Sequence, residues 1–181
     1  MPSPFDGPVT GTTPYPTIDT DPHAFRVVRY FRPRDYGTWG AVTTGIPAAF
    51  YLWGRFDPLP RMSRPQIRSV YIFATSIGFM GGFLMAYQNS SKRFWGWTEN
   101  HREQELDRVE MTKKIAEGKP LYGESSQPEH MQNVAVSNSR HSQLFFAILP
   151  WFNLVNHPYH GDYAKRYQAE EPKTPSTSQS S

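Results

Sequence analysis

The chain contains no cysteine among its 181 residues. Disulfides, thiolate zinc sites and cysteine-ligated iron–sulfur clusters are therefore excluded within it. It also lacks a glycine-rich phosphate loop, a dinucleotide-binding fingerprint, a nucleophile elbow and any nucleic-acid-binding motif. The basic excess is mild, since 19 Lys and Arg stand against 16 Asp and Glu. We therefore expect no catalytic residue, no cofactor, no bound metal and no nucleic-acid partner.

Positive charge is missing from the start of the chain, where residues 1–25 hold no Lys or Arg but include Asp6, Asp19 and Asp21. A secretory signal needs a basic start before an apolar run, and a mitochondrial presequence is rich in arginine and poor in acids. We therefore expect no cleaved presequence at this end. Six prolines within residues 1–22 instead predict an extended arm without regular structure.

Charged side chains are also absent from the run Ser69–Ser91. At about 1.5 Å per residue a helix of that length reaches roughly 35 Å, enough to cross a hydrocarbon core of about 30 Å. Small residues recur on it at every fourth position: Ala74, Gly78, Gly82 and Ala86. Four-residue spacing places them on one helix face, where a second helix can approach closely. The run predicts a membrane helix with a partner.

A second uncharged run, Tyr36–Gly54, supplies that partner. Its length lies near the short end of the range of about 17–25 residues for a membrane span. Ala41 and Gly45 form a small pair, four residues apart, that we expect to meet the Gly78–Gly82 face. Because this run is weakly hydrophobic, a buried helix of a soluble core remains an alternative for it.

The stretch between the two runs, 55–68, contains three prolines and four arginines. The prolines prevent one continuous helix, so the runs should form a hairpin with both termini on the same side. Eight Lys and Arg flank the hairpin on the terminal side, against the four in the loop. Because Lys and Arg are retained on one side of a membrane, this count favours both termini on the positive-retaining side.

Aromatic side chains gather at the ends of both runs, as they do at membrane–water interfaces. The predicted interface residues are Tyr36, Trp39, Trp53, Phe94, Trp95 and Trp97. The basic and aromatic segment His23–Tyr36, directly before the first run, is typical of an interfacial helix.

Beyond the hairpin the sequence turns polar. A charged helix is expected after the second run, with Glu110 four residues before Lys114 as a favourable pair. Residues 119–143 are loop-like, and residues 170–181 have the composition of a disordered tail. The apolar segment 144–155 is too short to span a membrane, so it should dock into a partner's groove or lie in the interface.

These patterns together predict an all-α membrane protein. Its centre is a two-helix transmembrane hairpin, with extended, largely irregular N- and C-terminal arms and a short polar helix after the second span. The expected divisions are 1–35 for the arm with its basic segment, 36–91 for the hairpin with spans of about 36–54 and 69–91, 92–118 for the charged helix, and 119–181 for the C-terminal arm.

The one cluster with metal-compatible side chains is His157, His160 and Asp162. No third histidine or cysteine stands near it. We therefore predict no metal site there. A small membrane enzyme using His157 and His160 remains the weakest alternative.

Two stretches carry a family resemblance: YPTIDTDPHAFRVVRYFRPRDY at Tyr15–Tyr36 and FWGWTENHREQELDR at Phe94–Arg108. With the two apolar runs between them, they resemble the twenty-one-kilodalton accessory subunit family of fungal mitochondrial NADH:ubiquinone oxidoreductase, respiratory complex I. The resemblance covers most of residues 15–160. It implies a structural subunit of the membrane arm, with no redox centre and no catalytic residues of its own.

The resemblance further implies the mitochondrial inner membrane. In that membrane the two predicted runs make a multi-pass protein, and the Lys and Arg count puts both termini on the matrix side. Its partners would be other membrane-arm subunits and phospholipids, and its contribution would be to assembly and stability. From the residues alone, another class stays open: a protein translocase component or a membrane-shaping protein, because glycine-rich hairpins suit those roles too.

Overall fold

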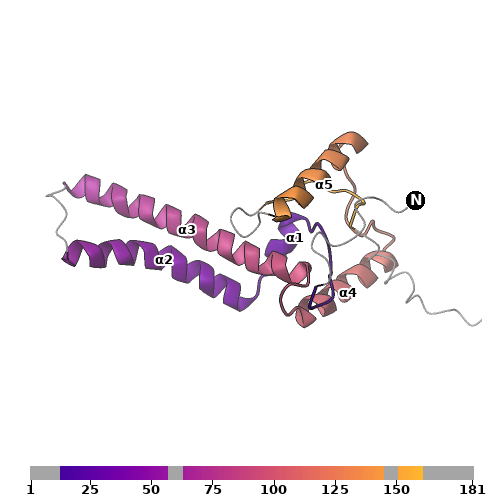
Figure 1. The fold of residues 1–181 in the computed structure, drawn as a ribbon, viewed down its shortest axis with the longest axis horizontal. Coiled ribbons are helices and arrows are strands. Elements are labelled where there is room, and N and C mark those ends of the chain that lie inside the picture. Colours follow the sequence, from indigo (N-terminus) through magenta and orange to yellow (C-terminus); the bar gives the residue numbers. More distant parts are fainter. Residues whose placement is uncertain (1–12, 57–62, 145–150, 161–181) are drawn as a thin grey trace, which may run out of the picture.

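The computed structural model describes residues 13–56, 63–144 and 151–160. In these ranges the chain forms five α-helices and no β-strand, which confirms the predicted all-α class for the described part. The helices are α1 (Ala24–Arg29), α2 (Pro33–Phe56), α3 (Arg64–Phe94), α4 (His101–Ala116) and α5 (Glu129–Leu144). Figure 1 shows α2 and α3 as a long hairpin that projects from a head containing α1, α4 and α5.

Both hairpin helices have recognisable start signals. Pro33 is the first residue of α2, a position where the missing proline N–H has no helical partner to lose. Before α3, the backbone N–H of Ser63 donates to Gln66 Oε1 at 2.8 Å, one half of a capping box. At about 1.5 Å per residue the two helices are roughly 36 and 46 Å long. They contain the predicted runs 36–54 and 69–91.

The predicted pair of membrane spans is only partly supported. Within the described residues, α3 alone is long and apolar enough to cross a membrane, by length and composition. Helix α2 has sufficient length, but glycines, threonines and Pro47 lower its hydropathy. The hairpin of two helices is thus present, whereas the second span is not confirmed.

The N-terminal arm lies against the head. Its N–H groups at Ile18 and Tyr15 donate to the carbonyl oxygens of Phe94 and Gly96, at 2.8 and 3.1 Å. Gly96 has a φ of +73°, and a Cβ atom there would lie 2.2 Å from the Tyr15 carbonyl oxygen. The turn after α3 therefore needs glycine, both for its left-handed backbone and for the close approach of the arm. The described part of the arm, residues 13–23, is irregular and packs on its own chain.

A hydrophobic core forms where the arm and α1 meet the last turns of α3. It contains Ile18, Ala24, Val27, Tyr30, Phe31, Ala86, Tyr87, Phe94 and Trp95. Helix α1 has six residues, and its orientation differs from the one expected for an interfacial helix. Arg26 is buried, whereas the Phe25 side chain is 75% exposed. The basic face of α1 therefore points inward, because acidic side chains of α4 lie inside the head opposite Arg26.

Helices α4 and α5 complete the head. Helix α4 falls within the predicted charged segment, and its Glu110–Lys114 pair is present, with Nζ 2.9 Å from Oε1. Helix α5 lies in the stretch 119–143, which was predicted to be loop-like, and that prediction is wrong. The local sequence has only a weak preference for helix. Contacts with distant residues stabilise the helix instead, since Val136 and Ser139 are buried against the rest of the head.

The apolar segment 144–155 is described at its two ends, Leu144 and residues 151–155. The second of these ends packs on its own chain, where the Phe152 ring stands 4.5 Å from Tyr87 and 6.1 Å from Phe83 between centroids. Residues 145–150, the start of the N-terminal arm (1–12) and the predicted disordered tail lie outside the described residues.

Candidate functional site

The predicted small-residue face of α3 lies inside the molecule. Its residues are all buried: Ala74, Gly78, Gly82 and Ala86. A Cβ atom added at Gly78 would lie 2.8 Å from the Val42 carbonyl oxygen, and one at Gly82 would lie 2.7 Å from that of Trp39. The two glycines therefore let the backbones of α2 and α3 touch.

The partner of this face on α2 differs from the predicted one. Ala41 and Gly45 are exposed, and a Cβ atom at Gly45 would meet nothing within 4 Å. Because successive residues turn by about 100° around a helix, Trp39, Val42 and Thr43 share the face that meets α3. The expected contact between Ala41–Gly45 and Gly78–Gly82 therefore does not occur within the chain.

The six predicted interface aromatics fall into two groups. Tyr36 and Trp53 are 53% and 68% exposed at opposite ends of α2. The remaining four pack inside the protein, wholly or in part: Trp39, Phe94, Trp95 and Trp97. Trp39 donates from Nε1 to the Phe79 carbonyl oxygen at 2.9 Å, and Trp95 donates to that of Thr20 at 3.1 Å. These four rings are held by their own chain: Trp39 packs on the middle of α3, and the other three lie where the head encloses its last turns.

Arg26 is the centre of a buried charge network in the head. Its guanidinium donates to Asp19 Oδ2 at 3.0 Å and to Asp107, and its Nε lies 3.8 Å from Glu110. Burial alone would raise the pKa of Asp19, but His160 and Arg26 beside it lower that pKa to about 2. Burial likewise opposes the charge of Glu110, yet Arg26 and Lys114 lower its pKa to about 2. Asp19 and Glu110 are therefore ionised at neutral pH.

A second group of charges joins the base of the hairpin to α4. Arg93 Nη2 lies 2.5 Å from Asp35 Oδ2, and Arg93 Nε lies 3.3 Å from Glu103 Oε1. Arg32 also donates to Glu103, from Nε at 2.8 Å and from Nη2 at 2.5 Å. Glu103 is fully buried, and a third arginine, Arg102, lies 3.7 Å from its Oε1, so three arginines compensate one enclosed carboxylate.

The histidines of the predicted metal-compatible cluster close the head from the C-terminal side. His157 Nε2 lies 3.1 Å from Asp21 Oδ2, and His160 Nδ1 lies 2.8 Å from Asp19 Oδ1. The two imidazole rings stack at 4.4 Å between centroids. Among the described residues no group of three His, Cys, Asp or Glu side chains could hold a metal ion. Asp162 lies outside the described residues.

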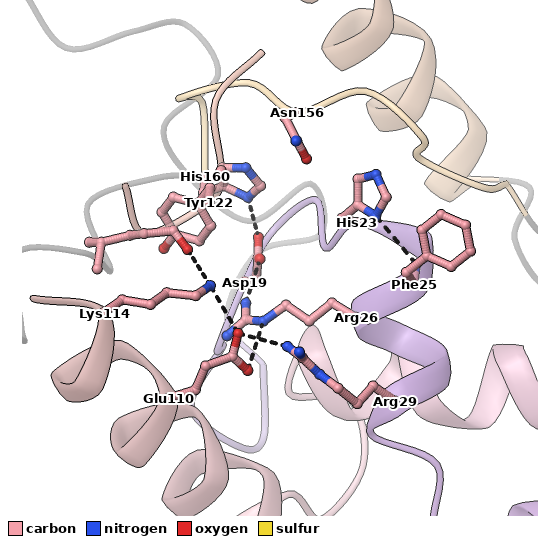
Figure 2. Close-up of a pocket in the computed structure, with 12 residues that line it drawn as sticks. Asp19, His23, Phe25, Arg26, Arg29, Glu110, Lys114, Tyr122, Asn156 and His160 are labelled. Carbon is pink, nitrogen blue, oxygen red and sulfur yellow. Dashed lines mark hydrogen bonds and ion pairs between the residues drawn. The ribbon is translucent and has the colours of Figure 1, made fainter. Parts of the chain in front are cut away.

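A pocket of about 310 Å³ opens between the arm, α1, α4 and the C-terminal segment. Figure 2 shows its lining residues, which include Asp19, Arg26, Arg29, Glu110, Lys114 and His160. Arg29 and Lys114 both pair with Glu110, at 2.7 and 2.9 Å. The Tyr122 ring stacks on His160 at 3.7 Å between centroids. The charges that line the pocket thus pair with one another, an arrangement that holds four segments together.

This network was not predicted from the sequence, although a signal for it exists. Arg26, Arg29 and Arg32 recur at three-residue spacing, while Glu103, Asp107 and Glu110 follow at spacings of four and three. The arginines lie on one face of the first segment and the acidic residues on one face of the second, so the two faces carry opposite charges. Complementary faces of this kind favour two packed segments over a basic segment that faces lipid.

Known proteins resemble this chain in sequence over most of its length. A family model described as NADH-ubiquinone oxidoreductase complex I, 21 kDa subunit, matches residues 12–99. A second model, described as the C-terminal of NADH-ubiquinone oxidoreductase 21 kDa subunit, matches residues 108–177. The chain is also 45% identical over 163 residues to the NADH-ubiquinone oxidoreductase 20.9 kDa subunit of Neurospora crassa, an alignment that covers 90% of this chain and 86% of that one.

Proposed function

The chain belongs to the 21 kDa subunit family of NADH-ubiquinone oxidoreductase, complex I, and from this premise we propose that it is a non-catalytic accessory subunit of the complex I membrane arm. The match to both family models, over residues 12–99 and 108–177, carries the proposal. In this role the chain resides in the mitochondrial inner membrane. It contributes to assembly and stability, while electron and proton transfer take place in other subunits.

The hairpin is the part of the chain that enters the membrane. Large apolar side chains are exposed along α3 from Ile67 to Met85, a distance of roughly 27 Å at about 1.5 Å per residue. That length is close to a hydrocarbon core of about 30 Å. From Ala86 onward the head encloses α3. The lipid-facing part of α3 is therefore shorter than the uncharged run 69–91, and the head rests against the membrane surface.

In this proposal α2 crosses beside α3 with another subunit on its outer side. Gly37, Ala41 and Gly45 follow one another at four-residue spacing on the face turned away from α3, and Cβ atoms added at both glycines would meet nothing within 4 Å. Small residues in membranes suit close helix contacts better than lipid contacts. We assign this face to a helix of a neighbouring membrane-arm subunit, and the bulkier flanks of the hairpin to phospholipids.

The exposed aromatic side chains and the basic residues indicate how the hairpin is oriented in the membrane. Tyr36 and Trp53, at opposite ends of α2, take opposite interfaces of the membrane. Both flanks of the hairpin join the head, where Lys and Arg are more numerous than in the loop, so we assign the head and both termini to the matrix side.

Deleting the chain from its native cells tests the accessory role. Native gel separation of mitochondrial membranes should show this chain migrating with NADH dehydrogenase activity in the wild type. In the deletion strain, we expect less assembled complex I or a truncated assembly, while the catalytic rate per intact complex is retained. Fully assembled complex I in normal amount in the deletion strain would contradict the proposal. Comigration of this chain with an import channel in the wild type would contradict it as well.

A further inference from the structure

Three arginines at the free end of the hairpin differ in their ion pairing from most other arginines that the structure describes. Arg26, Arg32 and Arg93, like the other paired arginines of the head, lie within ion-pair distance of a carboxylate. No such pair involves Arg55, Arg64 or Arg68 within the described residues, and all three are exposed. Arg34, at the head end of α2, is the remaining arginine of this kind among the side chains that the structure describes.

The positions of Arg64 and Arg68 cost helix stability. They stand one turn apart at the start of α3, which has no acidic residue in its first turn. Like charges at this spacing repel each other, and cations at the beginning of a helix oppose its dipole. The fold of the hairpin therefore gives no reason for these two charges, and a negatively charged surface outside the chain would supply one.

Exposed apolar side chains lie next to the three arginines along the two helix ends. Phe56 is 87% exposed, and Trp53 and Ile67 are exposed as well. We call the whole set the tip surface: Trp53, Arg55, Phe56, Arg64, Ile67 and Arg68. These residues belong to the end of α2 and the start of α3, and Figure 1 shows these two helix ends at the far end of the hairpin from the head. Aromatic and apolar groups next to arginines are typical of the boundary between hydrocarbon and lipid headgroups.

We propose that the tip surface binds the phosphate groups of anionic phospholipids in the leaflet opposite the head. This inference rests on the proposed function, because it requires the hairpin to span the membrane. Charge complementarity favours this occupant, since the described tip surface holds three arginines and no acidic residue. The planar guanidinium also matches phosphate geometry with two parallel hydrogen bonds. A lipid fits better than an acidic protein surface because the tip surface is continuous with the apolar sides of α2 and α3.

Lipid titration of the full-length chain tests the proposal. Native mass spectrometry would follow the binding of dioleoylphosphatidylglycerol and dioleoylphosphatidylcholine to the detergent-solubilised protein. The variants are Arg64→Gln with Arg68→Gln, and the same pair with Arg55→Gln. Arg108→Gln is the matched control, because Arg108 is an exposed arginine of α4 in the head.

The wild type and the control should prefer phosphatidylglycerol over phosphatidylcholine. We expect this preference to fall by about fivefold for each tip arginine removed. A preference that is unchanged in the triple variant would overturn the proposal, as would tip residues that cross-link to an acidic segment of another subunit in the intact complex. Incorporation into complex I, measured on the same variants by native gel, is the separate readout of the accessory role.

Discussion

Arg93 of α3 and Asp35 of α2 form a buried ion pair at the point where the hairpin enters the head, with Nη2 2.5 Å from Oδ2. Arg93 also reaches Glu103 of α4, so one guanidinium holds both hairpin helices and the head together. A charge cluster of this kind is rigid, because moving the hairpin against the head would separate enclosed opposite charges. The two parts of the chain should therefore behave as one body.

Removing Asp35 should destabilise this junction strongly. Asp35→Ala leaves Arg93 enclosed with less compensation, and breaking a buried pair costs about 3–5 kcal/mol. Glu105→Ala is the matched control, because its pair with Arg108 is exposed and worth less than about 1 kcal/mol. Denaturant unfolding of the full-length chain in detergent, followed by near-ultraviolet circular dichroism, measures both. Equal losses for the two variants would contradict a structural role for the pair.

Two adjacent glycines of α3 should respond in opposite ways to one added methyl group. Gly82→Ala places a Cβ atom 2.7 Å from the Trp39 carbonyl oxygen, so the helices must separate, at a cost of about 1–3 kcal/mol. At Gly81 the same atom meets nothing within 4 Å, and alanine there should stabilise the helix by about 0.5–1 kcal/mol. Thermal unfolding of both variants in detergent is the measurement. A Gly82→Ala protein as stable as Gly81→Ala would argue against backbone contact in the hairpin.

The turn after α3 offers a similar comparison. Gly96 and Gly118 have φ values of +73° and +63°, so alanine is strained at both. Only Gly96 has a close neighbour, the Tyr15 carbonyl oxygen, because a Cβ atom at Gly118 meets nothing within 4 Å. Gly96→Ala should therefore detach the arm, and limited proteolysis should cut the arm faster than in Gly118→Ala. Equal cleavage rates in the two variants would refute the contact.

Lowering the pH should destabilise the head over a pH range that the pKa of Asp19 sets. Its pKa is about 2 in the folded chain, against an ordinary value of 3.8. Because the folded value is the lower one, Asp19 stabilises the fold above about pH 4, and this contribution of about 2 kcal/mol is lost as the pH falls to about 2. Unfolding free energies between those pH values should drop more steeply for the wild type than for Asp19→Asn. Parallel curves would contradict this assignment.

The helices of the hairpin could be predicted because their signals are local. Uncharged runs and prolines determine where α2 and α3 begin and end, and the observed bounds contain both predicted runs. The face of α3 that carries Gly78 and Gly82 follows from spacing along one helix. Which residues of α2 meet that face depends on the rotation of α2 about its own axis, which Ala41 and Gly45 alone did not determine.

The head was harder to predict because its contacts join distant residues. Phe94 and Trp95 lie next to a membrane-like run, and local sequence alone assigns them to an interface. Their burial depends on the arm, far earlier in the chain, folding back over them. Helix α5 is a similar case, since Ser139 Oγ donates to Asp21 Oδ1 at 2.5 Å across 118 positions. A sequence pattern that covers a few helical turns does not identify a contact partner so far away in the chain.

The contact between His160 and Asp19 spans 141 positions, nearly the whole described chain. During synthesis the arm emerges first and its histidine partners emerge almost last, whereas the two hairpin helices can meet as soon as α3 exists. Contacts between neighbouring segments form faster than contacts between distant ones. We therefore expect the hairpin to form before the head closes. Until His157 and His160 have been made, Asp21 and Asp19 lack these two imidazole partners.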